Sequence, residues 1–195
     1  MAIAETPGCE PLTELEMHHR ILDKNSTKDV AGLFASAFSS SEGEKEGRLV
    51  GDLASRLALK IDNKDVICFG TCDEKESIIG VIFFTRLQFD QAIQVYMLAP
   101  VAVGTKHQGK GVGKALITYG LDDLKNRSVT VVVTYGDPSF YSKVGFQHLP
   151  EQTIKAPLKL SMPEGWLGQS LTGGPIPTID GRPICAEDFD DPVYW

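Results

Sequence analysis

The feature that most constrains this chain is a glycine-rich basic loop that joins an apolar run to a helical pattern. The apolar run Val101–Val103 ends at Gly104, and an apolar stripe at helical spacing begins at Val112. Glycines permit positive φ and close ligand approach, while the first amides of a helix have no partners inside it. The loop carries three lysines and no acidic residue: Lys106, Lys110 and Lys114. Since unpaired amides and the helix dipole attract anions, the pattern predicts a site for a small polyanion.

Composition indicates one soluble domain. The chain has 195 residues, 42% of them apolar, which is enough for one core at roughly 150 residues per domain. We expect a single domain over residues 1–195, with a core at about 12–160 and an irregular tail at 161–195. The formal charge of -7 argues against nucleic acid or an anionic membrane as a partner. The sequence has no secretory signal and no apolar run of membrane-spanning length, which predicts a cytoplasmic protein.

Neither a metal site nor a disulfide is expected. The four cysteines are scattered and lack Cys-x-x-Cys spacing, so reduced thiols are favoured. Cys68 and Cys72 lie in and just after a predicted strand, which favours core packing. Three histidines have no partner at ligand spacing and are interpreted as structural or surface residues: His18, His19 and His148.

The first half of the chain predicts one strand, two helices and three further strands. A strand is expected at residues 12–21, followed by a helix whose start is a capping box formed by Ser26 and Asp29. A polar loop at 39–44 separates this helix from a second one. Residues 66–71 and 78–85 read as a hairpin, and 92–103 as a longer strand. Because proline offers no amide to a ladder, a bulge is expected near Ala99 and Pro100.

The second half predicts a buried parallel strand and a short helix. After the helix that follows the glycine loop, the β-branched run 129–134 is typical of a strand buried on both faces. A right-handed crossover from the preceding strand is then the economical topology. A turn at 136–138 opens a short helix through Tyr141 that Gly145 ends. Late strands are expected at 146–149 and 152–160, with Trp166 and Trp195 anchoring the tail or lining a pocket.

Three known phosphate-binding patterns compete for the glycine loop. A nucleotide P-loop would need Ser or Thr after Lys110 to hold magnesium, but Gly111 stands there. A dinucleotide fingerprint would need a third glycine at Lys114 and an earlier position in the chain. The third pattern is Gln or Arg, two residues, Gly, one residue, then Gly or Ala, and residues 108–113 match every position.

This third pattern resembles the acyl-CoA motif of the GNAT superfamily of N-acetyltransferases. Residues 141–146, Tyr-Ser-Lys-Val-Gly-Phe, are similar to the Tyr-x-x-x-Gly-Phe signature of that family and follow the next strand, as the family order requires. The order of predicted elements is also similar, and the resemblance spans about residues 12–149, closest to a bacterial subgroup of predicted acetyltransferases. It implies an α/β fold with a mixed sheet, a splayed parallel strand pair and helices on both faces.

The resemblance also implies roles for particular residues. The backbone of Val101, Ala102 and Val103 would hold the pantetheine arm of acetyl-CoA, and Tyr141 would be the general acid. The pyrophosphate would lie on the loop and helix start, with Lys110 or Lys114 adding charge: Gln108, Gly109, Lys110, Gly111, Val112, Gly113 and Lys114. Lys106 and His107 are interpreted as solvated loop residues, and no metal is implied.

Two positions depart from the family pattern. Met97 occupies the place where some members carry a glutamate as general base, and Thr134 the place of a frequent coenzyme-binding asparagine. The resemblance implies an acetyl-CoA-dependent N-acetyltransferase that acts by direct attack of a primary amine of a small molecule or peptide. The alternatives are a GNAT-like acyl-CoA sensor or interaction module without turnover, and, from Gly104–Lys110 alone, a P-loop hydrolase. The sequence does not indicate the acceptor, and whether the chain is a homodimer stays open.

Overall fold

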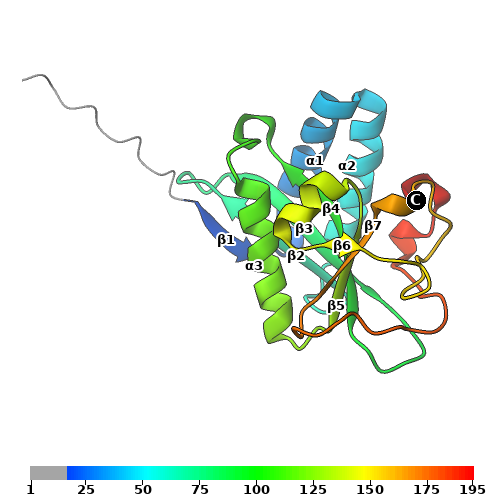
Figure 1. The fold of residues 1–195 in the computed structure, drawn as a ribbon. Coiled ribbons are helices and arrows are strands. Elements are labelled where there is room, and N and C mark those ends of the chain that lie inside the picture. Colours follow the sequence, from blue (N-terminus) through cyan, green and yellow to red (C-terminus); the bar gives the residue numbers. More distant parts are fainter. Residues whose placement is uncertain (1–16) are drawn as a thin grey trace, which may run out of the picture.

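A seven-stranded mixed sheet forms the centre of the protein in the computed structural model, which describes residues 17–195 (Figure 1). The strand order is β1-β2-β3-β4-β5-β7-β6. The strands are β1 (His18–Ile21), β2 (Val66–Cys72), β3 (Ile78–Leu87), β4 (Val95–Val103), β5 (Val131–Tyr135), β6 (Gln147–His148) and β7 (Trp166–Ser170). Every pairing is antiparallel except β4 with β5, so the predicted mixed sheet with one parallel pair is confirmed.

Helices cover both faces of this sheet, as expected (Figure 1). Helices α1 (Thr27–Glu42) and α2 (Glu44–Leu59) pack on one face, and α3 (Val112–Asn126) packs on the other. The strands alternate between the two cores, since Phe83 faces α1 and α2 while Ile82 and Phe84 face α3. Burial on both faces accounts for the continuous apolar runs in β2 to β5. Among the described residues, no helix is long and apolar enough to span a membrane.

The N-terminal elements differ from prediction in two details. Of the strand expected at 12–21, residues 12–16 lie outside the described part. The capping box is wrong: Ser26 makes no cap bond with its side chain, and Asp23 instead caps a 3-10 turn before α1. The loop expected at 39–44 is also wrong, because α1 continues to Glu42 and only Gly43, at φ 99°, separates it from α2. Ser40 and Ser41 donate to carbonyls one turn back, which lets them stay helical.

The bulge predicted in β4 is present. In the ladder between β3 and β4, Ile82 pairs with Val101 and Phe84 pairs with Leu98. Two steps along β3 therefore match three along β4, and the extra residue falls at Ala99 or Pro100. Because proline cannot donate to a ladder, the interruption occurs where the sequence requires it.

The C-terminal region departs most from prediction. Residues 152–160 form no strand, and the tail contains β7, which inserts between β5 and β6. Trp166 at the start of β7 is fully buried and its indole nitrogen donates to the carbonyl of Ile154 at 2.9 Å. The predicted strand instead turns at Pro150, whose carbonyl accepts from Thr153 and Ile154. The expectation that Trp166 and Trp195 anchor the tail agrees with their burial.

Candidate functional site

The glycine loop has the geometry that its sequence predicts. Helix α3 begins at Val112, with Gly111 as its N-cap at φ 83° and no side chain capping the first turn. Gly109 also has positive φ, 73°, and a Cβ at either glycine would meet nothing within 4 Å. The first amides of α3 have no partners inside the helix, so they and the helix dipole can receive an anion beside the loop.

Backbone and side-chain bonds tie this loop to the sheet. The amide of Gly104 donates to the carbonyl of Ile79 on β3 at 2.9 Å, and the 3-10 turn Thr105–His107 follows. The side-chain nitrogen of Gln108 donates to the carbonyl of Val103 at 3.0 Å. The glutamine side chain thus holds the loop against the end of β4, which leaves the backbone of the loop to contact a ligand.

A pocket of about 440 Å³ lies between β4, this loop and the short helix α4 (Pro138–Tyr141). Eight of the predicted binding residues line it: Val101, Val103, Gln108, Gly109, Gly111, Val112, Gly113 and Lys114. Ala102 does not line it, because strand alternation turns its side chain into the core under α1 and α2. Lys110 is exposed outside the lining.

Three residues that the sequence did not single out as ligands also line the pocket: His107, Phe140 and Lys143. His107 was expected to be solvated, yet it is half-buried and its Nδ1 atom is buried without a hydrogen-bond partner among the described residues. The 3-10 turn Thr105–His107 places His107 at the pocket, and no sequence pattern predicts this turn. Phe140 and Lys143 are three residues apart across one helical turn, so the spacing could have placed them on one side of the Tyr141 segment.

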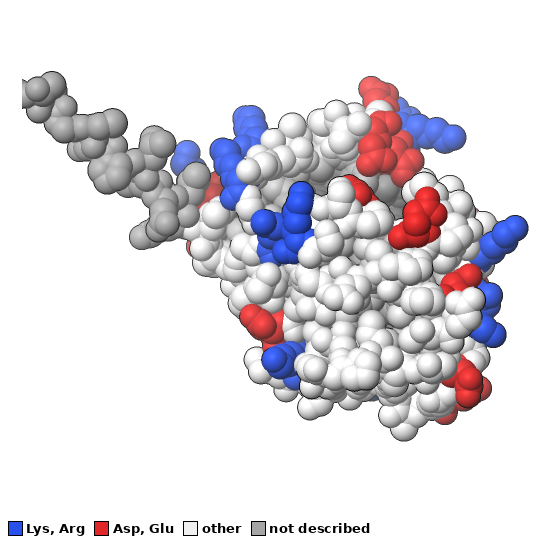
Figure 2. All heavy atoms as spheres, in the orientation of Figure 1, with Lys and Arg blue, Asp and Glu red and all other residues white. Residues whose placement is uncertain are grey.

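The pocket is locally basic on an acidic protein. Lys114 and Lys143 line it and no acidic residue does, whereas the whole chain has a charge of -7. Figure 2 shows basic side chains over the N-terminal end of α3, with acidic side chains gathered elsewhere on the same face. A polyphosphate would meet amides and ammonium groups together there.

Strands β4 and β5 separate beside this pocket. Their parallel pairing ends at Leu98 with Thr134, while β4 continues to Val103 paired only with β3. The splayed pair that the family resemblance implies is therefore present. The hydroxyl of Thr134 donates to the carbonyl of Leu98 at 2.8 Å, at the last residue pair before the opening.

Tyr141 lies near this opening but does not line the pocket itself. Its ring is half-buried against Phe140 and Phe146, and it belongs to the same apolar cluster as Val101. Burial raises the pKa of the phenol above its ordinary value of 10.0, and the nearby Thr134 side chain acts in the opposite direction. The phenol is therefore neutral at physiological pH and holds a proton that it can donate.

No proton acceptor stands at the position of the missing glutamate. Met97 is 1% exposed and packs in the core under α1 and α2. Its partner across the ladder is Thr85, which is buried and whose hydroxyl has no hydrogen-bond partner among the described residues. Neither side chain can serve as a base near pH 7.

Comparison with known proteins places this geometry among acetyltransferases. Residues 28–146 match the model of the acetyltransferase (GNAT) family. The chain is 29% identical over 185 residues to the uncharacterized N-acetyltransferase YjhQ of Escherichia coli K12, covering 89% of this chain and 96% of that protein. It is 32% identical over 120 residues to the uncharacterized N-acetyltransferase YhbS of the same strain, covering 61% and 68%.

Solved structures share the fold. A GNAT-family N-acetyltransferase from Escherichia coli, YhbS in complex with CoA, superposes with a TM-score of 0.75 at 23% identity, covering 94% of this chain and 97% of that chain. A GNAT-family acetyltransferase from Brucella melitensis in complex with acetyl-CoA has a TM-score of 0.62 at 22% identity, covering 91% and 100%.

Proposed function

Because this chain belongs to the acetyltransferase (GNAT) family, we propose that it transfers the acetyl group of acetyl-CoA to a primary amine of a small molecule or peptide. The observation that carries the proposal is a single pocket that joins the glycine loop, the free end of β4 and the helix of Tyr141. The glycine loop and the end of β4 can bind acetyl-CoA, and the helix of Tyr141 brings a neutral phenol close to the opening between β4 and β5.

The donor binds along two surfaces in this proposal. Amides from Gln108 to Gly113 receive the pyrophosphate, and Lys114 and Lys143 add charge. The pantetheine arm lies along Val101–Val103, where β4 has no partner on the side of β5. An amide-containing arm can pair there with the strand edge as an added strand would. Two proteins with this fold are in complex with CoA or acetyl-CoA, which supports this choice of donor.

The reaction is direct attack of a neutral amine on the thioester carbonyl. A C–N bond forms as the C–S bond breaks, and the negative charge passes from the carbonyl oxygen to the departing sulfur. A backbone amide near the bulge at Ala99 stabilises the oxyanion, a contribution typically of about 3 kcal/mol. Tyr141 donates its proton to the departing thiolate, and water takes the proton from the amine because Met97 cannot.

The first experiment offers acetyl-CoA and a broad amine panel to the full chain and detects the free thiol of released CoA. A blank without amine corrects for the chain's own cysteines. Acetyl-CoA should raise the Tm and slow hydrogen exchange at residues 108–113. If it does neither, the proposed donor site is wrong.

The second experiment tests the acid. Tyr141→Phe removes only a hydroxyl, so we expect kcat to fall by about 10²–10⁴-fold with nearly unchanged acetyl-CoA affinity. Tyr119→Phe, on the exposed side of α3, is the matched control and should retain wild-type kcat. An unchanged rate for the Tyr141 variant would assign the acid elsewhere.

The buried Met97 favours one alternative, an acyl-CoA sensor without turnover. It predicts that acetyl-CoA raises the Tm while no amine releases the thiol. Release of CoA with any amine of the panel rejects it.

A further inference from the structure

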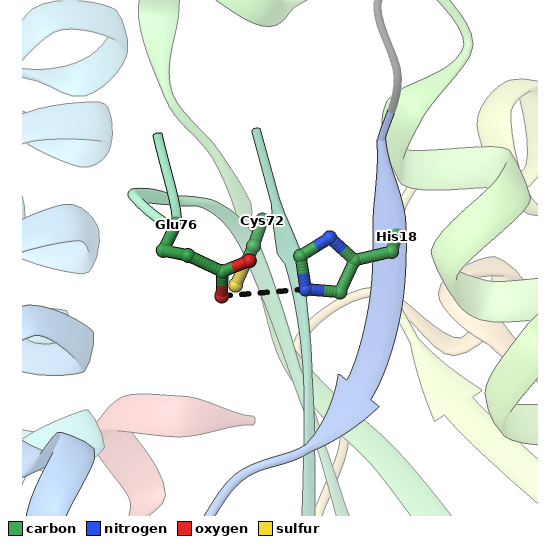
Figure 3. A group of neighbouring side chains, drawn as sticks. All are labelled: His18, Cys72 and Glu76. Atoms are coloured by element: carbon green, nitrogen blue, oxygen red, sulfur yellow. Dashed lines mark ion pairs between the residues drawn. The ribbon is translucent and has the colours of Figure 1, made fainter. Parts of the chain in front are cut away.

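Three side chains capable of binding a metal meet at the edge of the sheet, outside the lining of the acetyl-CoA pocket. His18 is on the edge strand β1, Cys72 ends β2, and Glu76 lies in the turn from β2 to β3 (Figure 3). Their ligand atoms all lie within 4.8 Å of one another, and Nε2 of His18 is 3.5 Å from a carboxylate oxygen of Glu76. Their sequence spacing gives no metal motif, and it is the pairing of His18 with Cys72 across the ladder that brings them together.

The strand geometry selects one of two adjacent histidines for this cluster. His19 points to the other face, where its Nδ1 lies 2.9 Å from the hydroxyl of Thr71 and its ring packs on Tyr119. His18 makes no such contact with the residues that the structure describes, and it directs its ring at Cys72 and Glu76 (Figure 3). The alternation of a strand therefore gives the two histidines different chemistry.

Hydrogen bonds fix the backbone of the turn that carries Glu76. The side chain of Asp73 accepts hydrogen bonds from the amides of Lys75 and Ser77, both at 2.9 Å, and the carbonyl of Asp73 accepts from the amide of Glu76. Glu76 adopts φ 60°, which non-glycine residues seldom do. The turn thereby directs the carboxylate of Glu76 over the Cys72 thiol, which is fully buried.

We propose that His18, Cys72 and Glu76 bind one divalent transition-metal ion of the Zn²⁺ type. Imidazole and thiolate ligands select zinc-like ions over Mg²⁺ or Ca²⁺, and three protein ligands leave a fourth tetrahedral position for water. Bonds of about 2.0–2.3 Å place ligand atoms roughly 3.3–3.8 Å apart, so the cluster must contract by about 1 Å. The side chains of His18 and Glu76 are 48% and 66% exposed, which leaves them free to make this adjustment.

Metal binding would join the edge strand to the hairpin. Within residues 17–195, strand β1 has four residues and pairs only with β2, so few contacts in this part of the chain hold it. An ion held by His18, Cys72 and Glu76 adds bonds from β1 to both β2 and the turn. Because the ion binds the folded state, it stabilises this edge by an amount that grows with the logarithm of the ion concentration once that concentration exceeds the Kd.

The test uses the full chain after chelator treatment, with Zn²⁺ titrated by calorimetry and Co²⁺ as a spectroscopic probe. We expect one ion per chain, a cobalt–thiolate charge-transfer band, a higher Tm and slower hydrogen exchange in β1. His18→Ala and Glu76→Gln, both at exposed positions, should each weaken binding by more than the roughly 10–100-fold typical of second-shell changes. Cys72→Ser should abolish the charge-transfer band.

Matched controls keep the test specific. Glu74→Gln changes an exposed carboxylate of the same turn, and His148→Ala an exposed histidine elsewhere. Both should bind Zn²⁺ like the wild type. The proposal is overturned if wild-type affinity equals that of His18→Ala, or if the cobalt–thiolate band persists in Cys72→Ser. His18→Ala and Glu76→Gln change exposed side chains and retain Cys72, so they test the site even if the serine variant is unstable.

Discussion

Replacing Gly111 by alanine tests whether the backbone of the glycine loop holds the coenzyme. At φ 83° an alanine pays about 1–2 kcal/mol for a left-handed conformation, and it recovers about 0.4–1 kcal/mol through the unfolded chain. No atom lies within 4 Å of the new Cβ, so no clash adds to this cost. The net loss of stability of about 1 kcal/mol corresponds to a fall of about 2–4 °C in Tm for a chain of this size.

The substitution should weaken acetyl-CoA binding more than it lowers the stability of the fold. Relaxation of φ at residue 111 turns the amides of Val112 and Gly113 away from the pyrophosphate position. Each charge-assisted hydrogen bond lost costs about 1.5–3 kcal/mol, so acetyl-CoA should bind about 10–100-fold more weakly in calorimetry. Gly173→Ala is the matched control, because Gly173 has φ 81°, equal open space and no place in the pocket. If both variants lose the same stability and bind acetyl-CoA equally well, the role assigned to the loop amides is wrong.

Three further predictions concern stability and pH. Gly120→Ala places a methyl group 2.6 Å from the Phe84 ring. Although alanine favours a helix more than glycine does, we expect the free energy of unfolding measured in urea to fall by about 1 kcal/mol. An unchanged urea midpoint would show that Phe84 moves aside without cost. Asp188→Asn should cost about 1–2 kcal/mol and reduce the salt dependence of Tm, because its buried carboxylate meets half-exposed Lys60 at 2.8 Å and Arg56 at 3.3 Å; wild-type salt dependence would contradict this. Because burial raises the pKa of Tyr141, the phenol keeps its proton up to its ordinary pKa of 10.0. Loss of this proton should therefore not lower kcat below about pH 10. A fall in kcat with a midpoint below about pH 9 that is absent in Tyr141→Phe would refute the assignment.

The local structure around the pocket was more predictable than that of the tail. Gln108 to Gly113 and the Tyr141 helix are local arrangements, because glycine conformation, helix start and strand end are set by neighbours within a few residues. The insertion of β7 was not predictable in this way. Its Gly168 and Gln169 have little strand preference, and the segment is a strand because β5 and β6 offer it partners on both sides.

The sequence by itself determined the elements with local causes: the apolar strands, the glycine loop, the bulge at Pro100 and the order of the two motifs. Only the tertiary structure decided which distant residues meet. His107 and Lys143 line the pocket beside the glycine loop because a 3-10 turn and a short helix converge on one strand end. His18 reaches Cys72 because two strands 54 positions apart pair in one register. Local propensity acts between residues a few positions apart, whereas strand pairing and burial bring together residues of any separation. A site whose residues are brought together by the sheet therefore has no characteristic sequence spacing.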